Sequence, residues 1–504
     1  MSSRFPPIKF GTDGWRAIIA REYTFENVER VAQAFADYLV SEKKESVLDQ
    51  LVGVGQLSAD EAREPRFAKV VTEAVEDSQP LVIVGYDCRF MSEHFAQRTA
   101  EVLTGNRLKV YLFTEPAPTP LISWAVKDLG ASGGVVITAS HNPPDFNGFK
   151  IKAPWGGSAT PATTAMVEKL VDATPPKRAE YTTPGGEQLA AAVESYRKQI
   201  NHYIDIERLR RTKGTLIVDS MHGSGGKWVE SFLRGGDLMI ETIRANRDPL
   251  FGGVNPEPID RNLSPLKERV IQSNALAGVA TDGDADRVGA VNELGETMTM
   301  HDVVPLILLH LVRNRKMIGG VVRTFSQSVL LRRIAAALGL ELHETAIGFK
   351  YIAELMQTED ILIGAEESGG IGVKGHIPER DGILNSLLFL EAVLTAGKPP
   401  SEMLRDLHRE FGEFHFGRAD LQMQVEPGTE LATALGSNAP AAFANEHVVD
   451  VQTVDGTKLI FGDDSWVLFR QSGTEPVLRI YAEATSKARV NELLIAGQEL
   501  NPGL

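Results

Sequence analysis

The sequence is poor in cysteine and in long apolar runs. Cys88 is the single cysteine among 504 residues, so no disulfide can form within one chain, which is typical of proteins in a reducing compartment. No apolar run resembling a signal peptide occurs in residues 1–10. The most apolar helical stretch, Val303–Val312, contains His310 and is too short to cross a bilayer. We therefore expect a cytoplasmic protein that has no membrane partner.

An excess of positive charge is also absent. Lysine and arginine number 52 against 67 aspartate and glutamate residues, which gives a formal net charge of −15. A general nucleic-acid-binding protein would present a basic surface, so we expect no nucleic-acid partner. A local basic pocket can still hold an anionic small molecule, because local charge overrides the global sign.

Short apolar runs recur along most of the chain, each followed by a glycine-rich or polar turn and a helical pattern such as Val28–Val40. Strands that alternate with helices indicate α/β layers with parallel or mixed sheets. No close sequence repeat is visible, so three related α/β units in series are inferred from the pattern alone. The expected strands are Leu81–Gly85, Leu108–Phe113, Gly133–Ile137, Thr215–Val218, Ala277–Ala280, Gly320–Thr324 and Ile361–Gly364.

The C-terminal region has a different pattern. Val448–Val454 and Lys458–Phe461 flank Asp455-Gly456, which predicts a hairpin. Further strands at Ser465–Arg470 and Val477–Glu483 and a helix at Lys487–Ala496 complete an α+β domain.

The chain is too long for one hydrophobic core, because domains average about 150 residues. Residues 41–80 are charged and helix-prone, and we interpret them as a helical insertion without chemistry. The predicted fold class is therefore three related α/β domains with mixed sheets plus a C-terminal α+β domain. Their predicted limits are 1–195, 196–300, 301–410 and 411–504.

Residues 136–150, Val-Ile-Thr-Ala-Ser-His-Asn-Pro-Pro-Asp-Phe-Asn-Gly-Phe-Lys, are the most informative stretch. An apolar strand runs into a loop that holds Ser140, His141 and Lys150 and is stiffened by two prolines. Asn147-Gly148 predicts a turn that tolerates positive φ. A hydroxyl on a rigid loop beside His and Lys suits a nucleophile or phosphate carrier. A helix N-cap serine in a tight surface turn explains the same residues about equally well.

A second motif, Asp282-Gly-Asp284-Ala-Asp286-Arg287, directly follows an apolar run. In an extended segment the three carboxylates would face one way and require a cation. Oxygen ligands without His or Cys favour magnesium, manganese or calcium. An EF-hand is disfavoured because its sixth position needs glycine and here holds Arg287. A solvated acidic turn is the plain alternative.

Two further glycine-containing loops carry polar side chains. Glu366 and Ser368, within Gly364-Ala-Glu-Glu-Ser-Gly-Gly370, suit hydrogen bonding to sugar hydroxyls, although an ordinary strand-to-helix loop explains them better when taken alone. Arg470-Gln-Ser-Gly-Thr-Glu-Pro476 combines a guanidinium fork with hydroxyls and backbone N–H groups, which favours phosphate binding over a solvated edge strand.

These four loops, together with Gly11-Thr-Asp13-Gly14-Trp15-Arg16 near the N-terminus, resemble in order the motifs of the α-D-phosphohexomutase family. This family comprises the phosphoglucomutases and phosphomannomutases. The resemblance covers nearly the whole chain and implies four domains around a central cleft, each contributing one loop.

The resemblance implies a role for each motif. Ser140 would be the phosphoserine, and its phosphate would hold one Mg²⁺ ion with the aspartates of the second motif. The residues that the resemblance assigns are Arg16, His141 and Lys150 at the transfer site, with Arg16 or Lys150 assisting proton movement; Asp282, Asp284 and Asp286 at the metal, with Arg287 beside them; Arg323, Lys350, Glu366 and Ser368 at the sugar; and Arg470, Ser472, Gly473, Thr474 and Arg479 at the phosphate that is not transferring.

The implied reaction interconverts hexose 1-phosphate and hexose 6-phosphate. Ser140 would give its phosphate to the sugar, and the resulting hexose 1,6-bisphosphate would turn over before returning a phosphate to Ser140; glucose 1,6-bisphosphate would serve as activator. Phosphoryl transfer of this kind depends on positioning and charge neutralisation. The partners are therefore small hexose phosphates, and the sequence does not reveal the oligomeric state.

Glucose is the favoured hexose. Bifunctional glucose/mannose members usually carry Met followed by Gly-His in the sugar loop, whereas this chain has Glu367 and then Gly369-Gly370, with Phe349-Lys350 nearby. The phosphoglucosamine branch usually carries Gln in this loop and fits poorly. The alternatives are a phosphomannomutase or bifunctional mutase, then a metal-dependent sugar phosphatase or a non-catalytic sugar-phosphate sensor.

Overall fold

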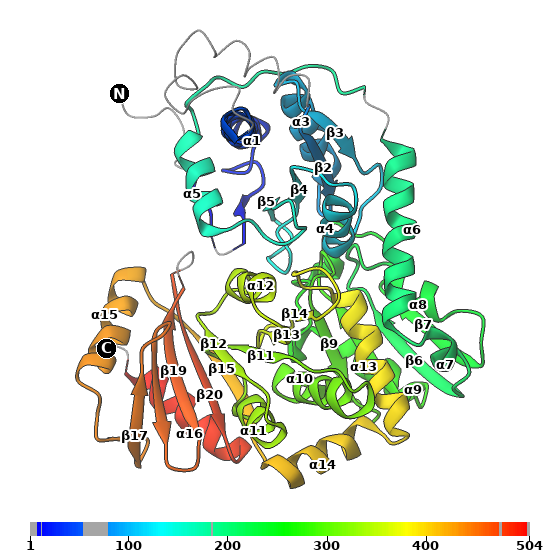
Figure 1. The fold of residues 1–504 in the computed structure, drawn as a ribbon. Helices are drawn as coiled ribbons and strands as arrows, with labels where there is room; N and C mark the ends of the chain where they lie inside the picture. Colours follow the sequence, from blue (N-terminus) through cyan, green and yellow to red (C-terminus); the bar gives the residue numbers. More distant parts are fainter. Residues whose placement is uncertain (1–7, 12, 54–78, 183–184, 473–475, 501–504) are drawn as a thin grey trace.

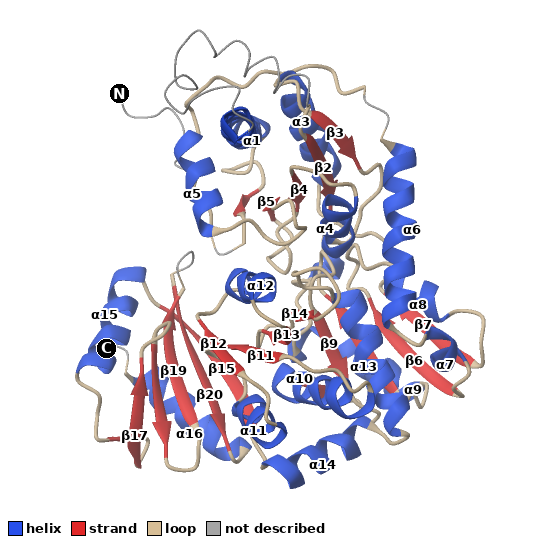
Figure 2. Ribbon diagram, viewed as in Figure 1, coloured by secondary structure: helices blue, strands red, loops and turns tan. Residues whose placement is uncertain are grey.

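The computed structural model describes residues 8–11, 13–53, 79–182, 185–472 and 476–500. The described chain forms four sheets, each with helices packed against it (Figures 1 and 2). The first sheet lies in an upper lobe, the second and third sheets lie below it, and the last sheet forms a lobe at the lower left of Figure 1. Within the described residues, no helix combines the length and the apolar character that crossing a membrane requires.

The first sheet has the strand order β1-β5-β4-β2-β3. Strands β4, β2 and β3 run parallel, whereas β5 is antiparallel to both β4 and β1. The apolar strands β2 and β4 are almost fully buried at the centre of the sheet, as their sequences predict. The elements of this unit are β1 (Trp15–Ile18), α1 (Phe25–Gly53), β2 (Leu81–Tyr86), α3 (Ser92–Gly105), β3 (Lys109–Leu112), α4 (Thr119–Asp128), β4 (Gly133–Ile137), β5 (Phe146–Lys152) and α5 (Pro161–Leu170).

The second sheet repeats this topology, with the order β10-β9-β8-β6-β7. Strands β8, β6 and β7 are parallel, and β9 is antiparallel to β8 and β10. The elements are α6 (Gly186–Tyr203), α7 (Ile206–Arg210), β6 (Gly214–Asp219), α8 (Trp228–Leu233), β7 (Leu238–Ile243), the short helical turns η3 (Phe251–Gly253) and η4 (Asp260–Asn262), α9 (Ser264–Gln272), β8 (Ala277–Thr281), β9 (Val288–Val291) and β10 (Thr297–Met298).

The third sheet has the order β12-β11-β13-β14, which matches β7-β6-β8-β9 of the second. Again the last strand is antiparallel to its neighbour while the others are parallel. The prediction of three related α/β units is thus confirmed by topology rather than by sequence repetition. The elements are α10 (Met300–Leu309), the π-helical turn η5 (His310–Asn314), β11 (Gly320–Thr324), α11 (Val329–Leu338), β12 (Leu342–Thr345), α12 (Phe349–Thr358), β13 (Ile361–Ala365), β14 (Ile371–Val373), α13 (Gly382–Ala396) and α14 (Pro400–Phe411).

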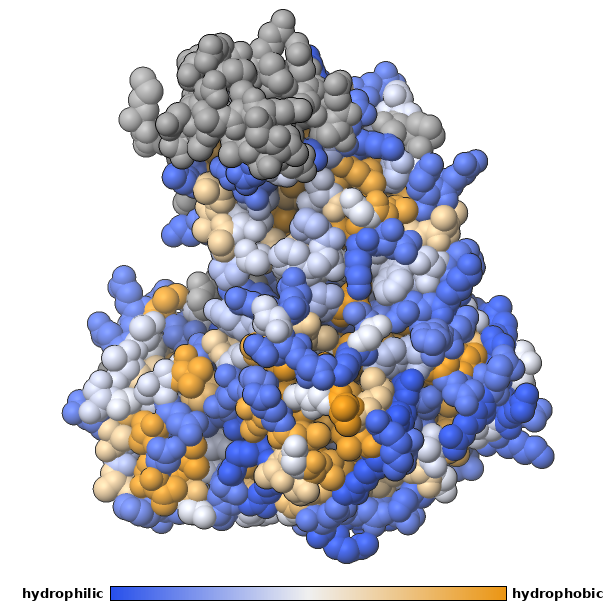
Figure 3. Space-filling view, in the orientation of Figure 1, coloured by the Kyte–Doolittle hydropathy of each residue, from blue (hydrophilic) through white to orange (hydrophobic). Residues whose placement is uncertain are grey.

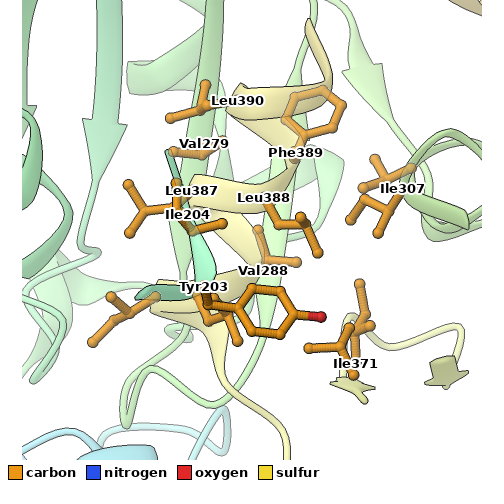
Figure 4. Close-up of a cluster of buried hydrophobic side chains, with 14 of the residues drawn as sticks. Tyr203, Ile204, Val279, Val288, Ile307, Ile371, Leu387, Leu388, Phe389 and Leu390 are labelled. Atoms are coloured by element: carbon orange, nitrogen blue, oxygen red, sulfur yellow. The ribbon is translucent and has the colours of Figure 1, made fainter. Parts of the chain in front are cut away.

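Helix α13 joins the second and third units into one core. It is apolar over most of its circumference and buried from Gly382 to Val393, and it packs on β8 and β9 of the second sheet as well as on α10. Figure 4 shows Leu387, Leu388, Phe389 and Leu390 of this helix among side chains from β8, β9, α10 and β14. A helix that is apolar all round requires such burial on several sides. The two units therefore form one packed body.

The C-terminal lobe is a mixed α+β structure, as predicted. Its sheet has the order β15-β20-β19-β18-β17-β16, with every neighbouring pair antiparallel. One face packs against the lobe's two helices, and the other packs through Trp466, Leu468 and Tyr481 against Phe325 of the third unit. The elements are β15 (His415–Gln422), α15 (Val425–Ser437), β16 (Ala442–Phe443), β17 (Glu446–Gln452), β18 (Thr457–Phe461), β19 (Trp466–Gln471), β20 (Val477–Ala484) and α16 (Lys487–Glu499).

The face shown in Figure 3 carries hydrophilic side chains interspersed with hydrophobic ones, and its outline is indented between the upper lobe and the C-terminal lobe. Each sheet falls within one of the four predicted domain ranges, but a helix crosses each predicted limit: α6, α10 and α14. The domain limits themselves stay a prediction. The helix predicted within residues 41–80 is present as far as Gly53, and residues 54–78 lie outside the described part of the chain.

One predicted turn is wrong. Asn147-Gly148 does not form a turn with positive φ, because both residues lie inside strand β5 and pair with Ala17 and Arg16 of β1. Gly148 instead permits close packing, since a Cβ there would lie 2.5 Å from the carbonyl oxygen of Thr138. Lys150 is consequently a strand residue rather than a loop residue.

Candidate active site

Three of the predicted motifs occupy the same position in the three related units. Each lies in the connection between a central strand and the antiparallel strand that follows it: Ser140 after β4, Asp282 after β8 and Glu366 after β13. Open α/β sheets bind ligands outside the carboxyl ends of their strands. The repeated topology therefore brings the motifs of three units to equivalent sheet edges.

Ser140 and the aspartate motif are in direct contact. The Ser140 hydroxyl donates a hydrogen bond of 2.7 Å to Asp282 Oδ2, although the two residues are 142 positions apart. His141 Nδ1 lies 3.3 Å from the same hydroxyl oxygen. Ser140 is buried and has a left-handed backbone with φ of 52°, which is uncommon for a residue other than glycine. The two strongest motifs of the sequence thus form one site.

The aspartate motif is a tight turn, and the prediction of an extended segment is wrong. The backbone N–H groups of Asp286 and Arg287 both donate to Asp282 Oδ1, and Ala285, which precedes them, has φ of 59°. Gly283 lets this turn approach the serine loop, because a Cβ there would lie 2.5 Å from the Ser140 carbonyl oxygen. Side-chain capping of its own turn, rather than strand alternation, therefore gathers the carboxylates.

The three carboxylates are fully buried, with one oxygen of each lying within 4.8 Å of the others. Burial, together with the charges of Asp284 and Asp286, raises the pKa of Asp282 well above its ordinary value. Burial would also raise the pKa of Asp284, but Lys150, Thr119 and Arg380 together outweigh burial and lower it. Negative charge in this turn therefore depends on a nearby cation.

Lys150 supplies positive charge from strand β5. Its Nζ lies 2.9 Å from Asp284 Oδ2, 3.1 Å from Asp286 Oδ2 and 2.9 Å from Asp13 Oδ2. Burial lowers the pKa of Lys150, but these three carboxylates outweigh burial and raise it. Lys150 therefore stays protonated and ties the N-terminal loop to the aspartate turn.

The site fits a hard divalent cation. Asp284 Oδ1 and Asp286 Oδ1 are buried and accept no hydrogen bond from any described residue, and Asp282 Oδ2 is bonded only to the Ser140 hydroxyl. Buried polar atoms without a partner are costly, so this geometry indicates a further positively charged ligand. The donor set is all oxygen, which suits Mg²⁺ or Mn²⁺ better than Zn²⁺.

Arg16 and His141 line the same edge. Arg16 Nη1 donates to Asn142 Oδ1 at 2.7 Å, so the arginine lies over the serine loop. Burial lowers the pKa of His141, and the positive charges of Arg287, Arg16 and Arg479 lower it further. Arg479 belongs to β20, so this end of the C-terminal sheet lies within electrostatic reach of His141. The structure thus brings the predicted transfer residues together around Ser140.

The glutamate loop adjoins the aspartate turn. Arg287 forms a β-bridge with Gly370, and the Val288 N–H donates to the Gly369 carbonyl at 3.1 Å. Burial raises the pKa of Glu366 to about 7. Ser368 is half-buried beside it. A carboxyl group and a hydroxyl next to the aspartate turn suit recognition of a polyhydroxylated ligand.

The remaining predicted sugar residues lie on neighbouring elements of the third unit. Arg323 of β11 forms an ion pair with Glu344 at 2.6 Å and donates to the Ser328 carbonyl at 3.1 Å. Lys350 lies in the first turn of α12. Burial lowers its pKa, while the charges of Asp13 and Asp455 act in the opposite direction. Lys350 therefore lies within electrostatic reach of both the N-terminal loop and the C-terminal lobe.

Arg470 and Arg479 are direct cross-strand partners on β19 and β20. Arg470 Nε also lies 2.9 Å from Asp455 Oδ2. Ser472 is buried, and its N–H donates to the Val477 carbonyl at 2.9 Å. The predicted Gly473 and Thr474 lie outside the described residues. The described part of this motif is thus a cationic surface on the C-terminal sheet.

Two buried arginines were not foreseen from the sequence. Arg380 Nη2 lies 2.5 Å from Asp13 Oδ2 and 2.9 Å from Asp286 Oδ2. It therefore connects the third unit to the N-terminal loop and to the aspartate turn. Arg89, after β2, binds the backbone of the serine loop. Arg380 could have been suspected from the run Glu379-Arg380-Asp381, which precedes an apolar helix. The residues around Arg89 in the sequence give no such indication.

Comparison with known proteins gives a consistent result along the chain. Models of the phosphoglucomutase/phosphomannomutase family match alpha/beta/alpha domain I at residues 7–56 and 50–178, domain II at 194–295, domain III at 301–411 and the C-terminal domain at 429–495. These matches cover most of the chain in the order of the four sheets.

Relatives with assigned names include a phosphoglucomutase/phosphomannomutase of Thermococcus kodakarensis, 31% identical over 97% of this chain and 98% of the relative. A phosphoglucosamine/phosphogalactosamine mutase of Sulfurisphaera tokodaii is 28% identical over 96% of this chain and 97% of the relative. A crystal structure from Thermus thermophilus, provisionally assigned as a phosphomannomutase, has a TM-score of 0.80 and 34% identity over 99% of this chain and 100% of that chain.

Proposed function

Because the chain belongs to the phosphoglucomutase/phosphomannomutase family, whose members are intramolecular phosphotransferases, we propose that it interconverts hexose 1-phosphate and hexose 6-phosphate through a phosphorylated Ser140. The observation that carries this proposal is the 2.7 Å contact between the Ser140 hydroxyl and Asp282 within a buried carboxylate triad. A serine held against a divalent-cation site is suited to carry a phosphoryl group, because transfer depends mainly on positioning and charge neutralisation.

Each transfer moves one phosphoryl group and one proton. The bond between phosphorus and Ser140 Oγ breaks, a bond forms to a sugar hydroxyl oxygen, and the hydroxyl proton passes to Ser140 Oγ. We propose that His141, whose Nδ1 lies 3.3 Å from Ser140 Oγ, and Arg16, which donates to Asn142 of the serine loop, assist this proton movement. Lys150 and Arg380 hold the aspartate turn in place through Asp13 and Asp286.

The cofactor in this proposal is one Mg²⁺ ion, held by Asp282, Asp284, Asp286 and the phosphate of Ser140. When bound, it would neutralise the phosphoserine charge and polarise the phosphorus. The buried Oδ1 atoms of Asp284 and Asp286, which accept no hydrogen bond from the described residues, support this assignment.

The second phosphate of the substrate needs its own site. We assign it to Arg470, Ser472 and Arg479, with Gly473 and Thr474 of the same motif, because two guanidinium groups at opposite positions of neighbouring strands attract a dianion. The hexose 1,6-bisphosphate has to reverse its orientation between the two half-reactions. A phosphate site in the C-terminal lobe, separate from Ser140, accommodates either phosphate of this intermediate.

Glucose is the proposed hexose, with mannose as the alternative. Glu366 Oε2 lies 3.6 Å from Arg380 Nη1, and Glu367 accepts a hydrogen bond from the Ser326 hydroxyl at 2.5 Å. These contacts hold the loop in one conformation, in which we propose that Glu366 and Ser368 face ligand hydroxyls. The named relatives include glucosamine enzymes as well, and single loop residues shift sugar preference only modestly.

A coupled assay tests both reaction and substrate. Glucose 1-phosphate, mannose 1-phosphate and glucosamine 1-phosphate are compared with Mg²⁺ and a trace of the matching bisphosphate, and inorganic phosphate is measured in parallel. The proposal expects the highest kcat/KM with glucose 1-phosphate and almost no release of inorganic phosphate. Steady phosphate release would indicate a phosphatase, and binding without turnover would indicate a sensor.

A further inference from the structure

We propose that Arg89 is a positioning residue that sets the backbone conformation of the Ser140 loop and thereby the place of the reacting hydroxyl. This inference rests on the proposed phosphoserine function. Arg89 follows β2, is completely buried and cannot touch a substrate. Its role therefore has to operate through the residues that it binds.

The Arg89 guanidinium donates to four backbone carbonyls of the serine loop. Nη2 donates to the carbonyl oxygens of Ser140 and Asn142, both at 2.6 Å. Nη1 donates to the carbonyl oxygens of Pro143 at 2.7 Å and Phe146 at 3.0 Å. A loop normally leaves such carbonyls to water. Here one side chain binds four of them, which holds the whole segment between β4 and β5 in a single shape.

The same guanidinium is anchored on its other edge. Arg89 Nε lies 3.2 Å from Asp87 Oδ2, and Phe251 packs its ring against the guanidinium, with 5.0 Å from Cζ to the ring centroid. Asp87 Oδ2 also accepts a hydrogen bond of 2.6 Å from the Thr138 hydroxyl, whose oxygen accepts the Ser140 N–H at 2.8 Å. Asp87 and Arg89 thus hold Ser140 from both its N–H and its carbonyl.

This double hold accounts for the conformation of Ser140. A left-handed backbone at a non-glycine residue is energetically unfavourable and persists only when its surroundings enforce it. The hydrogen bonds from Arg89 to the Ser140 carbonyl and from Ser140 N–H to Thr138 define the peptide planes on each side. Without them we expect the loop to relax toward an ordinary backbone and to carry the hydroxyl away from Asp282.

The Ser140 carbonyl that Arg89 binds also contacts the aspartate turn. A Cβ on Gly283 would lie 2.5 Å from the Ser140 carbonyl oxygen, so the two loops touch at this atom. A shift of that carbonyl would therefore change the distance between Ser140 Oγ and the aspartates. Misplacement of a reacting group by about 1 Å can reduce turnover on the order of 100-fold.

The contacts require arginine. Lysine has one nitrogen and cannot satisfy four carbonyls and a carboxylate that lie around a planar fork. The test is therefore Arg89→Lys, which keeps the buried charge, with Arg30→Lys as matched control. Arg30 is also buried in the first unit and forms a bidentate pair with Asp172 at 2.7 and 2.6 Å.

Both variants are compared with wild type by steady-state kinetics, melting temperature and hydrogen exchange of residues 138–147. We expect Arg89→Lys to lower kcat about 10- to 100-fold, to keep KM within about 3-fold of wild type, and to speed hydrogen exchange in the loop. We expect Arg30→Lys to leave kcat and hydrogen exchange in the loop unchanged. Arg89→Ala with added guanidinium supplies a second measurement, in which guanidinium but not ammonium is expected to restore turnover.

Two results would overturn the inference: wild-type kcat and loop protection in Arg89→Lys, or equal losses in Arg89→Lys and Arg30→Lys. An inactive wild type would instead contradict the proposed function. In that case hydrogen exchange still decides the role of Arg89, because loop protection in Arg89→Lys can be compared with wild type without turnover.

Discussion

Arg470 and Arg479 lie directly opposite each other on the antiparallel strands β19 and β20. Like charges at such positions destabilise a sheet, because the side chains are only about 5 Å apart at Cβ. Asp455 neutralises part of this charge through its ion pair with Arg470. In our proposal this pair of arginines binds the phosphate of the substrate that is not being transferred.

We predict that Arg470→Ala raises KM for hexose 1-phosphate about 10- to 100-fold with a smaller change in kcat, since a charge-assisted hydrogen bond contributes about 1.5–3 kcal/mol. Steady-state kinetics checks this. Arg489→Ala is the control. Arg489 lies on α16, which packs against the opposite face of the sheet, and it pairs with Glu446 at 2.8 Å. An unchanged KM in Arg470→Ala would remove this residue from the phosphate site.

Removal of divalent cations is predicted to abolish turnover, by at least about 100-fold, and Mg²⁺ should restore it. The carboxylates of Asp284 and Asp286 have buried oxygens that accept no hydrogen bond within the described chain, so each should contribute to metal affinity. Asp284→Asn and Asp286→Asn should weaken Mg²⁺ binding in a calorimetric titration. Asp464→Asn should not, because Asp464 of the C-terminal lobe pairs with Arg333 of α11. Full activity in excess chelator would contradict a metal role.

Glu483 of β20 connects the C-terminal lobe to the third unit. It accepts hydrogen bonds from His301 Nδ1 at 2.8 Å, the Ser328 hydroxyl at 2.5 Å and the Val329 N–H at 2.9 Å, and from Trp466 of its own sheet at 2.8 Å. Burial would raise the pKa of Glu483, but His301 and the other donors outweigh burial and lower it from 4.5 to about 2.

A carboxyl whose pKa is depressed on folding stabilises the protein above its unfolded pKa and loses that contribution as pH falls. For Glu483 the contribution is roughly 3 kcal/mol at neutral pH, and it declines between about pH 4.5 and pH 2. We predict that Glu483→Gln weakens hydrogen-exchange protection in β19 and β20 at pH 7, and that its difference from wild type narrows below pH 4.5. If the difference in protection between Glu483→Gln and wild type did not change with pH, the ionised carboxylate of Glu483 would not be the cause of the difference.

Most of the candidate site was predictable because its chemistry is local in sequence. The carboxylates of Asp282, Asp284 and Asp286 lie within five residues, and Ser140 lies three residues after an apolar strand, so their types and spacing were visible. The strands were predictable for the same reason, since β2, β4, β8 and β13 are largely apolar runs and β11 begins with one.

The remainder depends on contacts between distant residues. Lys150 looked like a loop residue because Asn147-Gly148 is a common turn pair, but pairing with β1 holds that segment in a strand. Arg89 has no distinctive neighbours in sequence, and the loop carbonyls that it binds lie 51 to 57 residues away. Arg380 stands between two acidic residues before an apolar helix, but its partner Asp13 lies 367 residues away. Side-chain hydrogen bonds likewise folded the aspartate motif into a turn that alternation does not predict.

The most direct test of the account asks where the phosphoryl group is stored. Wild-type protein and Ser140→Ala are incubated with Mg²⁺ and labelled glucose 1,6-bisphosphate, the labelled peptide is located by mass spectrometry, and mutase activity and glucose 1-phosphate binding are measured on the same samples. We predict label on Ser140 in the wild type, and neither label nor turnover in Ser140→Ala, whose affinity for glucose 1-phosphate should stay within about 3-fold of wild type because the phosphate and sugar sites lie on other loops. Full turnover in Ser140→Ala, or label on a different residue, would contradict the account.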